Sequence, residues 1–163
     1  MKNSRIIFIV IASLSFFVCS ERVNLEVEKA EIKATLDKYH QAINEENIEL
    51  LSQIIAPDED LVWIPAAKNS SMNWASLERG WESTQKSYEN WFKLSDKINY
   101  SYKDEIIKIN QLGNAAWISC IQYGDEIFKN EPASFDGCRA TLGLEKRKGN
   151  WIIVQGHWSF PKD

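Results

Sequence analysis

Arg139 and the two histidines, His40 and His157, are the residues whose side chains could do chemistry in a pocket. An arginine guanidinium is a planar, permanently charged fork that suits a carboxylate or a similar anion. A neutral imidazole, with a pKa of about 6.5, suits proton transfer if it faces a pocket and lies beside a carboxylate. Each residue also has a structural alternative. Arg139 could pair with Asp136 or with an acid of the first helix, and each histidine could be a hydrogen-bonded residue of a sheet face or a helix.

Other catalytic signatures are absent from the sequence. It contains no glycine-rich phosphate loop, nucleophile elbow or metal triad. The acidic run 58–60 directly precedes an expected strand and is typical of solvated surface charges. We therefore expect no cofactor and no metal.

Cys120 and Cys138 are the two cysteines of the expected folded domain. Neither belongs to a CxxC motif or has a histidine nearby, so a zinc site is not expected. In an oxidising compartment they could form a disulfide if their strands bring them together. Two buried free thiols are the alternative, and the sequence leaves both open.

The first 20 residues have the pattern of a secretory signal peptide. Lys2 and Arg5 precede an apolar stretch over residues 6–18, which is shorter than the ~20 residues that a membrane-spanning helix needs. Ordinary cleavage would leave Glu21 as the first residue. Cys19 could instead be the lipidation site of a bacterial lipoprotein. We expect an exported protein, periplasmic or secreted, whose only membrane contact would be such a lipid anchor.

Length and charge limit the remaining classes. A chain of 163 residues with 44% hydrophobic content fits one domain, here residues 21–163. Without Lys2 and Arg5 the 19 basic residues become 17, so against 23 acidic residues the formal charge is −6. This acidic balance argues against nucleic acid as a partner.

The N-terminal half is expected to be mainly helical. A first helix is predicted up to Glu45 or Glu46, a second over residues 48–55 and a short strand over 61–65. Asn73 is predicted to cap a third helix. The apolar stripe of the first helix is Leu25, Ile32, Leu36, Tyr39 and Ile43, and that of the third is Trp74, Leu77, Trp81, Thr84, Tyr88 and Trp91.

The C-terminal half is expected to form four long strands. A strand from about residue 98 to residue 109 changes its apolar parity near Asp104 and Glu105, which predicts a bulge. A strand over 115–128 and a loop over 129–134 follow. The chain ends in a hairpin whose strands, 139–145 and 150–160, are joined by the tight turn Lys148-Gly149.

This order of elements resembles the nuclear transport factor 2-like superfamily and, within it, the SnoaL-like domains. The resemblance is carried by residues 39–51, Gly80-Trp81-Glu82, Arg139 and the motif over 151–159, and it covers about residues 25–161. The final motif is also similar to the association domain of calcium/calmodulin-dependent kinases. The resemblance implies an α+β cone in which three helices of the N-terminal half pack on the concave face of a curved antiparallel sheet. It also implies a homodimer through the convex face.

The facing of the candidate residues depends on the hairpin register. Counting outward from the turn places Arg139 opposite Trp158 and Ala140 opposite His157. The kinase resemblance implies that Trp158 lines the concave cavity, so Arg139 should line it too and His157 should not. The expected ligand-binding residues are Arg139, Trp158, Tyr123, Ser119, Trp63, Trp81 and Tyr39.

The superfamily hosts several activities on one scaffold, so the fold does not define the function. We expect the cavity to bind a small, partly apolar and potentially anionic molecule. One alternative is a cofactor-independent isomerase, dehydratase or cyclase whose base is a histidine, with His157 and His40 as candidates, or a carboxylate. The other is a dimeric assembly module.

Overall fold

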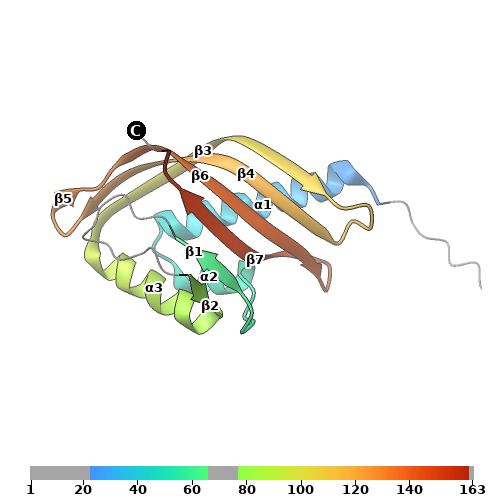
Figure 1. The fold of residues 1–163 in the computed structure, drawn as a ribbon, viewed down its shortest axis with the longest axis horizontal. Helices are drawn as coiled ribbons and strands as arrows, with labels where there is room; N and C mark the ends of the chain where they lie inside the picture. The colour runs from blue at the N-terminus through green and yellow to red at the C-terminus, as the bar shows by residue number, and fades with distance from the viewer. Residues whose placement is uncertain (1–22, 66–76, 162–163) are drawn as a thin grey trace, which may run out of the picture.

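A computed structural model describes residues 23–65 and 77–161 (Figure 1). The expected signal peptide, Cys19, Asn73 and Trp74 lie outside these residues. Within the described ranges, no helix combines the length and the apolar character that crossing a membrane requires.

Two N-terminal helices confirm the helical prediction. Helix α1 spans Leu25–Asn44, and the Asn24 side chain accepts a hydrogen bond from the backbone of its first turn. Helix α2 spans Ile48–Ile54 and is capped in the same way by Asn47. The predicted apolar stripe of α1 faces inward from Ile32 onward, because Ile32, Leu36, Tyr39 and Ile43 are all buried. Its first member, Leu25, is 49% exposed, so the prediction is wrong for that residue.

The third helix begins later than predicted. Helix α3 spans Trp81–Leu94, and Gly80 precedes it without a side-chain cap. Residues Glu78–Arg79 form strand β2, which pairs with strand β1 (Val62–Ile64). Gly80 has a φ of 78°, which lets the chain turn sharply from β2 into α3. The helical periodicity from Leu77 onward therefore overstated the length of the helix at its N-terminal end.

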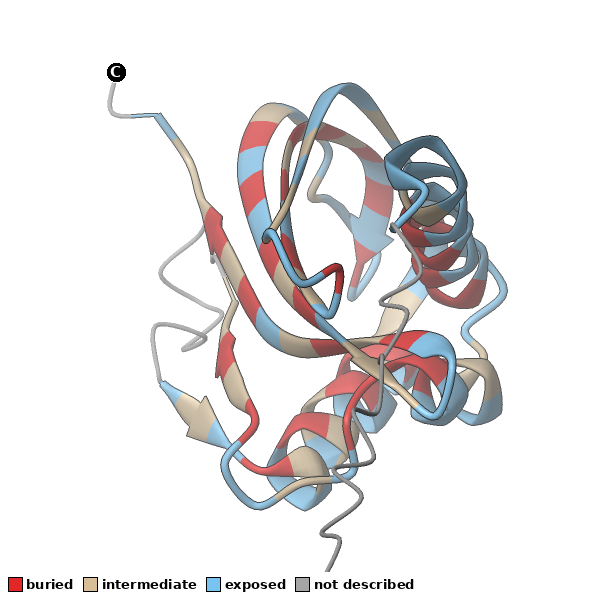
Figure 2. Ribbon diagram, turned by 90° about the vertical axis from the view of Figure 1, so that its right-hand side faces the viewer, coloured by how far each residue is buried: buried red, intermediate tan, exposed pale blue. Residues whose placement is uncertain are grey.

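The predicted α+β fold, three helices on one curved sheet, is confirmed. The strand order of the sheet is β2-β1-β7-β6-β4-β3. The four long strands in it are antiparallel neighbours, namely β3 (Ser95–Ile109), β4 (Ala115–Phe128), β6 (Phe135–Arg147) and β7 (Asn150–Ser159). β1 runs parallel to β7, so the sheet is mixed. Residues Glu131–Pro132, expected in a loop, form the short strand β5 beside β4. Figure 2 shows buried and exposed residues alternating along the long strands, with the helices on one face.

Two of the register shifts in the sheet bear on the predicted facing of side chains. The predicted bulge in β3 lies between Lys103 and Ile106, where Asp104 has a positive φ of 56°. A second bulge, which the sequence did not predict, lies opposite Gly143 and Leu144 and leaves Val154 without a paired residue.

The second bulge makes the predicted hairpin register wrong beyond it. The turn itself is as predicted, since Arg147 pairs with Asn150 across Lys148-Gly149. Farther along, Arg139 lies opposite Ser159 and Ala140 lies opposite Trp158. Arg139 and Trp158 consequently lie on opposite faces of the sheet.

Candidate ligand-binding cavity

A cavity of about 90 Å³ lies between the sheet and α3, and α1 closes part of it. This volume has room for several water molecules, or for a ligand of about one ring. Its walls are largely aromatic. They include Tyr39, Trp63, Tyr88, Trp91, Phe135 and Trp158.

The sequence packs these rings closely by keeping one strand position small. Gly156 of β7 is buried, and a Cβ atom there would lie 2.6 Å from the Trp158 ring and 2.7 Å from the Trp63 ring. The two indoles lie with ring centroids 4.8 Å apart. Glycine at this position therefore lets both rings lie against the sheet as one cavity wall.

Glu126 forms one polar wall, and donors occupy both of its carboxylate oxygens. Oε1 accepts hydrogen bonds from Trp91 Nε1 at 2.6 Å and from Ser95 Oγ at 3.1 Å. Oε2 accepts a hydrogen bond from the Tyr100 hydroxyl at 2.5 Å. Burial, and then the neighbouring Glu126, raise the pKa of Tyr100, which therefore stays a donor. Glu126 is 3% exposed and is held as an acceptor within the core.

Glu78 is the second carboxylate of the cavity, and it is only half satisfied. Its Oε1 accepts a hydrogen bond from Ser87 Oγ at 2.6 Å. Its Oε2 is buried without a hydrogen-bond partner, and no other buried side-chain polar atom of the described residues is in that state. Burial raises the pKa of Glu78, and the Ser87 hydrogen bond only partly opposes this effect.

A chain of hydrogen bonds fixes the third polar group, Gln122. Trp158 Nε1 donates to Gln122 Oε1 at 2.7 Å, and Gln122 Nε2 lies 2.8 Å from His40 Nε2. His40 Nδ1 lies 3.0 Å from the Leu36 carbonyl, so the partners assign the proton to Nδ1 and leave Nε2 to accept from Gln122. Burial lowers the pKa of His40 and favours this neutral form. His40 therefore lies behind the cavity wall and positions Gln122 and, through it, Trp158.

Two tyrosine hydroxyls meet in the wall of the cavity. Tyr39 of α1 and Tyr88 of α3 lie 2.9 Å apart through their oxygens. Burial raises the pKa of both hydroxyls, and for Tyr88 the nearby Tyr39 and Glu78 add to the effect. The hydrogen bond between the two hydroxyls uses one hydroxyl proton. The other hydroxyl proton stays free, so this dyad can donate one hydrogen bond to a ligand.

Three of the sequence-predicted binding residues line the cavity together. They are Trp158, Trp63 and Tyr39. Trp81, at the first position of α3, is half-buried against the core and does not line the cavity.

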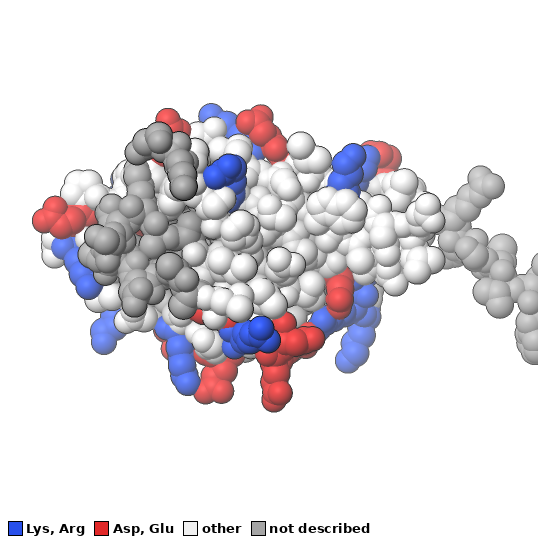
Figure 3. Space-filling view, in the orientation of Figure 1, with Lys and Arg blue, Asp and Glu red and all other residues white. Residues whose placement is uncertain are grey.

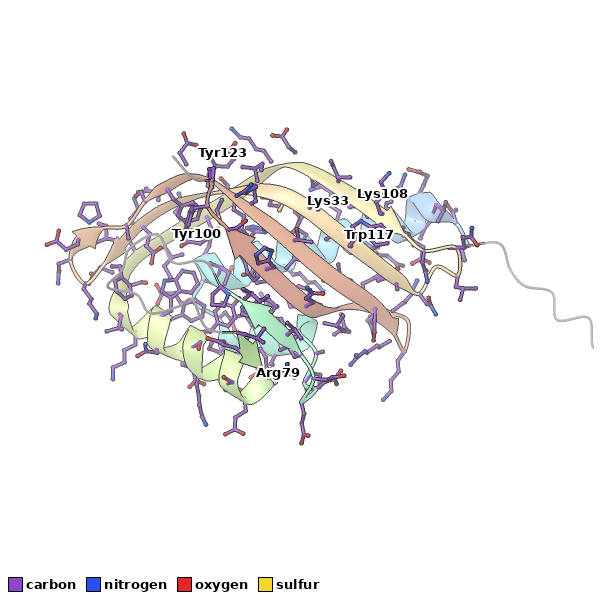
Figure 4. The ribbon with its side chains drawn as sticks, viewed as in Figure 1. Lys33, Arg79, Tyr100, Lys108, Trp117 and Tyr123 are labelled. Carbon is purple, nitrogen blue, oxygen red and sulfur yellow. The ribbon has the colours of Figure 1, made fainter. Side chains whose placement is uncertain are left out.

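The other predicted binding residues lie on the outer face of the sheet. Arg139 is exposed, and its Nη2 donates to the Phe160 carbonyl at 2.9 Å. Ser119 and Tyr123 of β4 have the same parity as exposed Trp117, and Figure 4 shows Tyr123 on the side of the sheet remote from α3. His157 pairs with Thr141 of β6 and lies outside the cavity, as predicted. The facing predicted for Arg139, Ser119 and Tyr123 is wrong, because the bulge at Val154 inverts the parity on which it was based.

Sequence reasoning missed three polar residues of the cavity, namely Glu78, Gln122 and Glu126. Gln122 and Glu126 have the same parity as the buried apolar residues of β4, so a correct facing of this strand would have identified both. Glu78 carried no comparable signal, because it was assigned to a helix and lies in a two-residue strand.

Cys120 and Cys138 are both buried free thiols. Cys120 pairs with Ala140, and Cys138 pairs with Gln122, so the two cysteines are diagonal rather than directly opposite. Burial raises the pKa of Cys120 to about 12 and that of Cys138 to about 11, which keeps both protonated at neutral pH. Over residues 23–65 and 77–161 no cluster of three metal-ligating side chains occurs.

The model of the SnoaL-like domain family matches residues 32–163. The chain belongs to this family. No curated protein matches it.

Solved structures with low sequence identity share the fold. A nuclear transport factor 2-like superfamily protein from Salmonella enterica has a TM-score of 0.71 and 19% identity, covering 85% of this chain and 94% of that one. A candidate dehydratase from Streptomyces avermitilis has a TM-score of 0.72 and 13% identity, covering 85% and 99%. A candidate calcium/calmodulin-dependent protein kinase II association domain from Xanthomonas campestris has a TM-score of 0.66 and 20% identity, covering 82% and 88%.

Proposed function

We propose that this protein binds a small, partly apolar molecule in the cavity between the sheet and α3. The supporting observation is a buried space with aromatic walls and a few converging polar groups, which is the usual composition of a small-molecule site. Glu78 Oε2 and the Tyr39–Tyr88 dyad are the groups with capacity left for a ligand. Glu126 and Gln122 are occupied by protein partners and hold the walls in place.

The anionic ligand considered from the sequence loses its support with Arg139 outside the cavity. None of the described lining residues is a lysine, arginine or histidine. We therefore infer a ligand that is not an anion.

A cavity-filling variant tests the binding proposal. Ala133 is half-buried and lines the cavity, so Ala133→Phe should fill it and abolish binding of small aromatic compounds found in a thermal-shift screen. Ala115→Phe, at the far end of β4 and outside the cavity, is the matched control. Equal binding by the folded Ala133→Phe protein and the wild type would place the ligand elsewhere.

A second candidate function is cofactor-independent proton transfer, as in an isomerase or dehydratase. The observation that favours it is Glu78, a carboxylate with a free oxygen and a raised pKa beside the Tyr88 hydroxyl. Such a carboxylate could take a proton from a substrate while a tyrosine hydroxyl stabilises the oxygen that becomes negative. The candidate dehydratase among the structural neighbours supports this option through the shared fold alone.

Product analysis separates the two functions. A compound that binds and is recovered unchanged after long incubation indicates a binding protein. Conversion that Glu78→Gln abolishes, while the variant keeps its affinity for the compound, indicates an enzyme.

We propose further that the outer sheet face forms a homodimer. Over β7, β6 and β4 this face is mostly uncharged, and charged groups lie along its margins (Figure 3). Trp117 and Ile106 on the outer face are 51% and 58% exposed. Sedimentation should give a dimer for the wild type and a monomer for Trp117→Glu. A monomeric wild type would contradict this proposal.

Export by the N-terminal segment also stays a proposal. Mass spectrometry of the protein expressed with its own leader tests it, because ordinary cleavage gives a chain that starts at Glu21 and lipidation gives a modified chain that starts at Cys19. A chain that keeps its N-terminal 18 residues would contradict export.

A further inference from the structure

The two carboxylates of the cavity differ in the number of hydrogen bonds that they receive. Glu126 receives three side-chain hydrogen bonds, from Trp91, Ser95 and Tyr100. Glu78 receives one, from Ser87, and its Oε2 has no partner although the atom is buried. A buried carboxylate oxygen without a donor is costly, since water cannot replace the missing hydrogen bond. The cavity therefore contains a strong acceptor whose donor the described residues do not provide.

The rest of the lining favours a positive charge. The described residues contribute two carboxylates to the cavity and no basic side chain. The faces of the tryptophan and tyrosine rings carry negative electrostatic potential and attract cations. Both features act in the same direction, and they act in a space from which water is partly excluded, where charge interactions are strengthened.

We propose that the cavity binds a small primary amine in its protonated form, with the ammonium group donating to Glu78 Oε2 and the apolar body between the aromatic walls. The inference rests on the proposed binding function and names its ligand class. The volume of about 90 Å³ limits the body to about one ring or a short alkyl group.

Other ligand classes fit less well. An anion would meet two carboxylates and, among the described lining residues, no counter-charge. A neutral alcohol could donate one hydrogen bond to Glu78, but it would leave the negative charge of the carboxylate uncompensated. An ammonium group donates the hydrogen bond and also compensates the negative charge. A hydrogen bond between two charged groups is stronger than one between neutral groups.

Glu78 is also the group whose titration should accompany binding. Burial raises its pKa in the free protein, and an adjacent ammonium group would lower it again. The groups that face Glu78 from its neighbouring elements are Ser87 and Tyr88 of α3 and its strand partner Trp63 of β1. These groups stay uncharged at neutral pH. Amine affinity should therefore fall as the pH is lowered and Glu78 becomes protonated.

The test uses three probes of one size and different charge, which are benzylamine, benzyl alcohol and benzoate. Isothermal titration calorimetry on the purified protein at neutral pH should give an affinity for benzylamine at least about tenfold above that for benzyl alcohol, and no binding of benzoate. Glu78→Gln should reduce benzylamine affinity by about tenfold and change benzyl alcohol affinity by less than about threefold. Glu82→Gln, a fully exposed site on the first turn of α3, is the matched control and should bind like the wild type.

The outcomes separate the ligand class from the function. If benzyl alcohol or benzoate binds as tightly as benzylamine, and Ala133→Phe abolishes that binding, the amine inference is overturned and the cavity remains a binding site. The same holds if Glu78→Gln leaves benzylamine affinity unchanged. If none of the three probes binds, the amine inference fails, and the proposed binding function fails with it if the wider thermal-shift screen is also empty.

Discussion

The two carboxylates that line the cavity, Glu126 and Glu78, differ in how far the protein satisfies them. Three side chains donate to Glu126, which is almost fully buried. Glu78 has a single donor and an unpaired oxygen. A carboxylate that the protein itself satisfies stabilises the fold, whereas one left partly unsatisfied lowers stability and is available to a ligand. The same substitution at the two positions should therefore have opposite effects.

The largest effect is expected at Glu126. Glu126→Gln should lower the free energy of unfolding by about 2–3 kcal/mol, because the amide replaces one acceptor oxygen by a donor that faces another donor. Urea denaturation measures the change, and Asp125→Asn on the exposed side of the same strand is the control. A loss below about 0.5 kcal/mol would mean that the three hydrogen bonds do not hold this wall.

A smaller effect is expected at Gln122. Gln122→Leu removes the partner of Trp158 Nε1 and of His40 Nε2, so unfolding free energy should fall by about 1–2 kcal/mol. Gln155→Leu, an exposed glutamine on β7, is the matched control. If the two variants have equal stability, the hydrogen-bonded chain through His40 contributes nothing to the fold.

The contribution of Glu78 should be visible in the pH dependence of stability. Its pKa is raised above the ordinary value of 4.5, so the folded protein binds more protons than the unfolded chain in the window just above that value. The Glu78 contribution to stability is therefore present at low pH and is lost as the pH rises through the folded-state pKa. Because solvent reaches part of this side chain, we expect a total change below about 1 kcal/mol.

The variants Glu78→Gln and Glu82→Gln isolate this contribution. The difference between wild type and Glu78→Gln in urea denaturation should become less favourable to the wild type from pH 4 to pH 7. Glu82 should behave in the opposite way, because Lys86 lowers its pKa and its contribution is lost as the pH falls. A wild-type protein that gains stability relative to Glu78→Gln as the pH rises would show that Glu78 has a charge partner in the folded state.

The smallest effect is expected at Arg139. Its guanidinium is exposed and outside the cavity, so Arg139→Ala should change stability by less than about 0.5 kcal/mol and leave benzylamine affinity unchanged. Calorimetry and urea denaturation check both statements. Loss of ligand affinity in this variant would return Arg139 to the binding site.

The contrast between Trp158 and Arg139 shows how far the sequence could predict the site. Periodicity in α1 and the Lys148-Gly149 turn follow from local patterns, and the cone fold was implied by the resemblance to the SnoaL-like domains. Two residues share a face of the sheet only if the count of residues between their pairing positions is correct. The single unpaired residue Val154 changes this count by one and so reverses the face, and nothing in the sequence signals it. Glu78 was not identified for a related reason. The helical spacing of α3 continues by chance back to Leu77, so the residues of β2 were assigned to the helix.

A crystal structure of the protein with benzylamine tests the central claim most directly, namely that the ligand binds at the unsatisfied carboxylate, Glu78. The ammonium nitrogen should lie about 2.7–2.9 Å from Glu78 Oε2, with the ring between Trp63, Tyr88 and Trp158 and with Glu126 still bonded to its three donors. An ammonium group at Glu126 that displaces Tyr100 or Trp91, or a ligand found only on the outer sheet face, would contradict the claim.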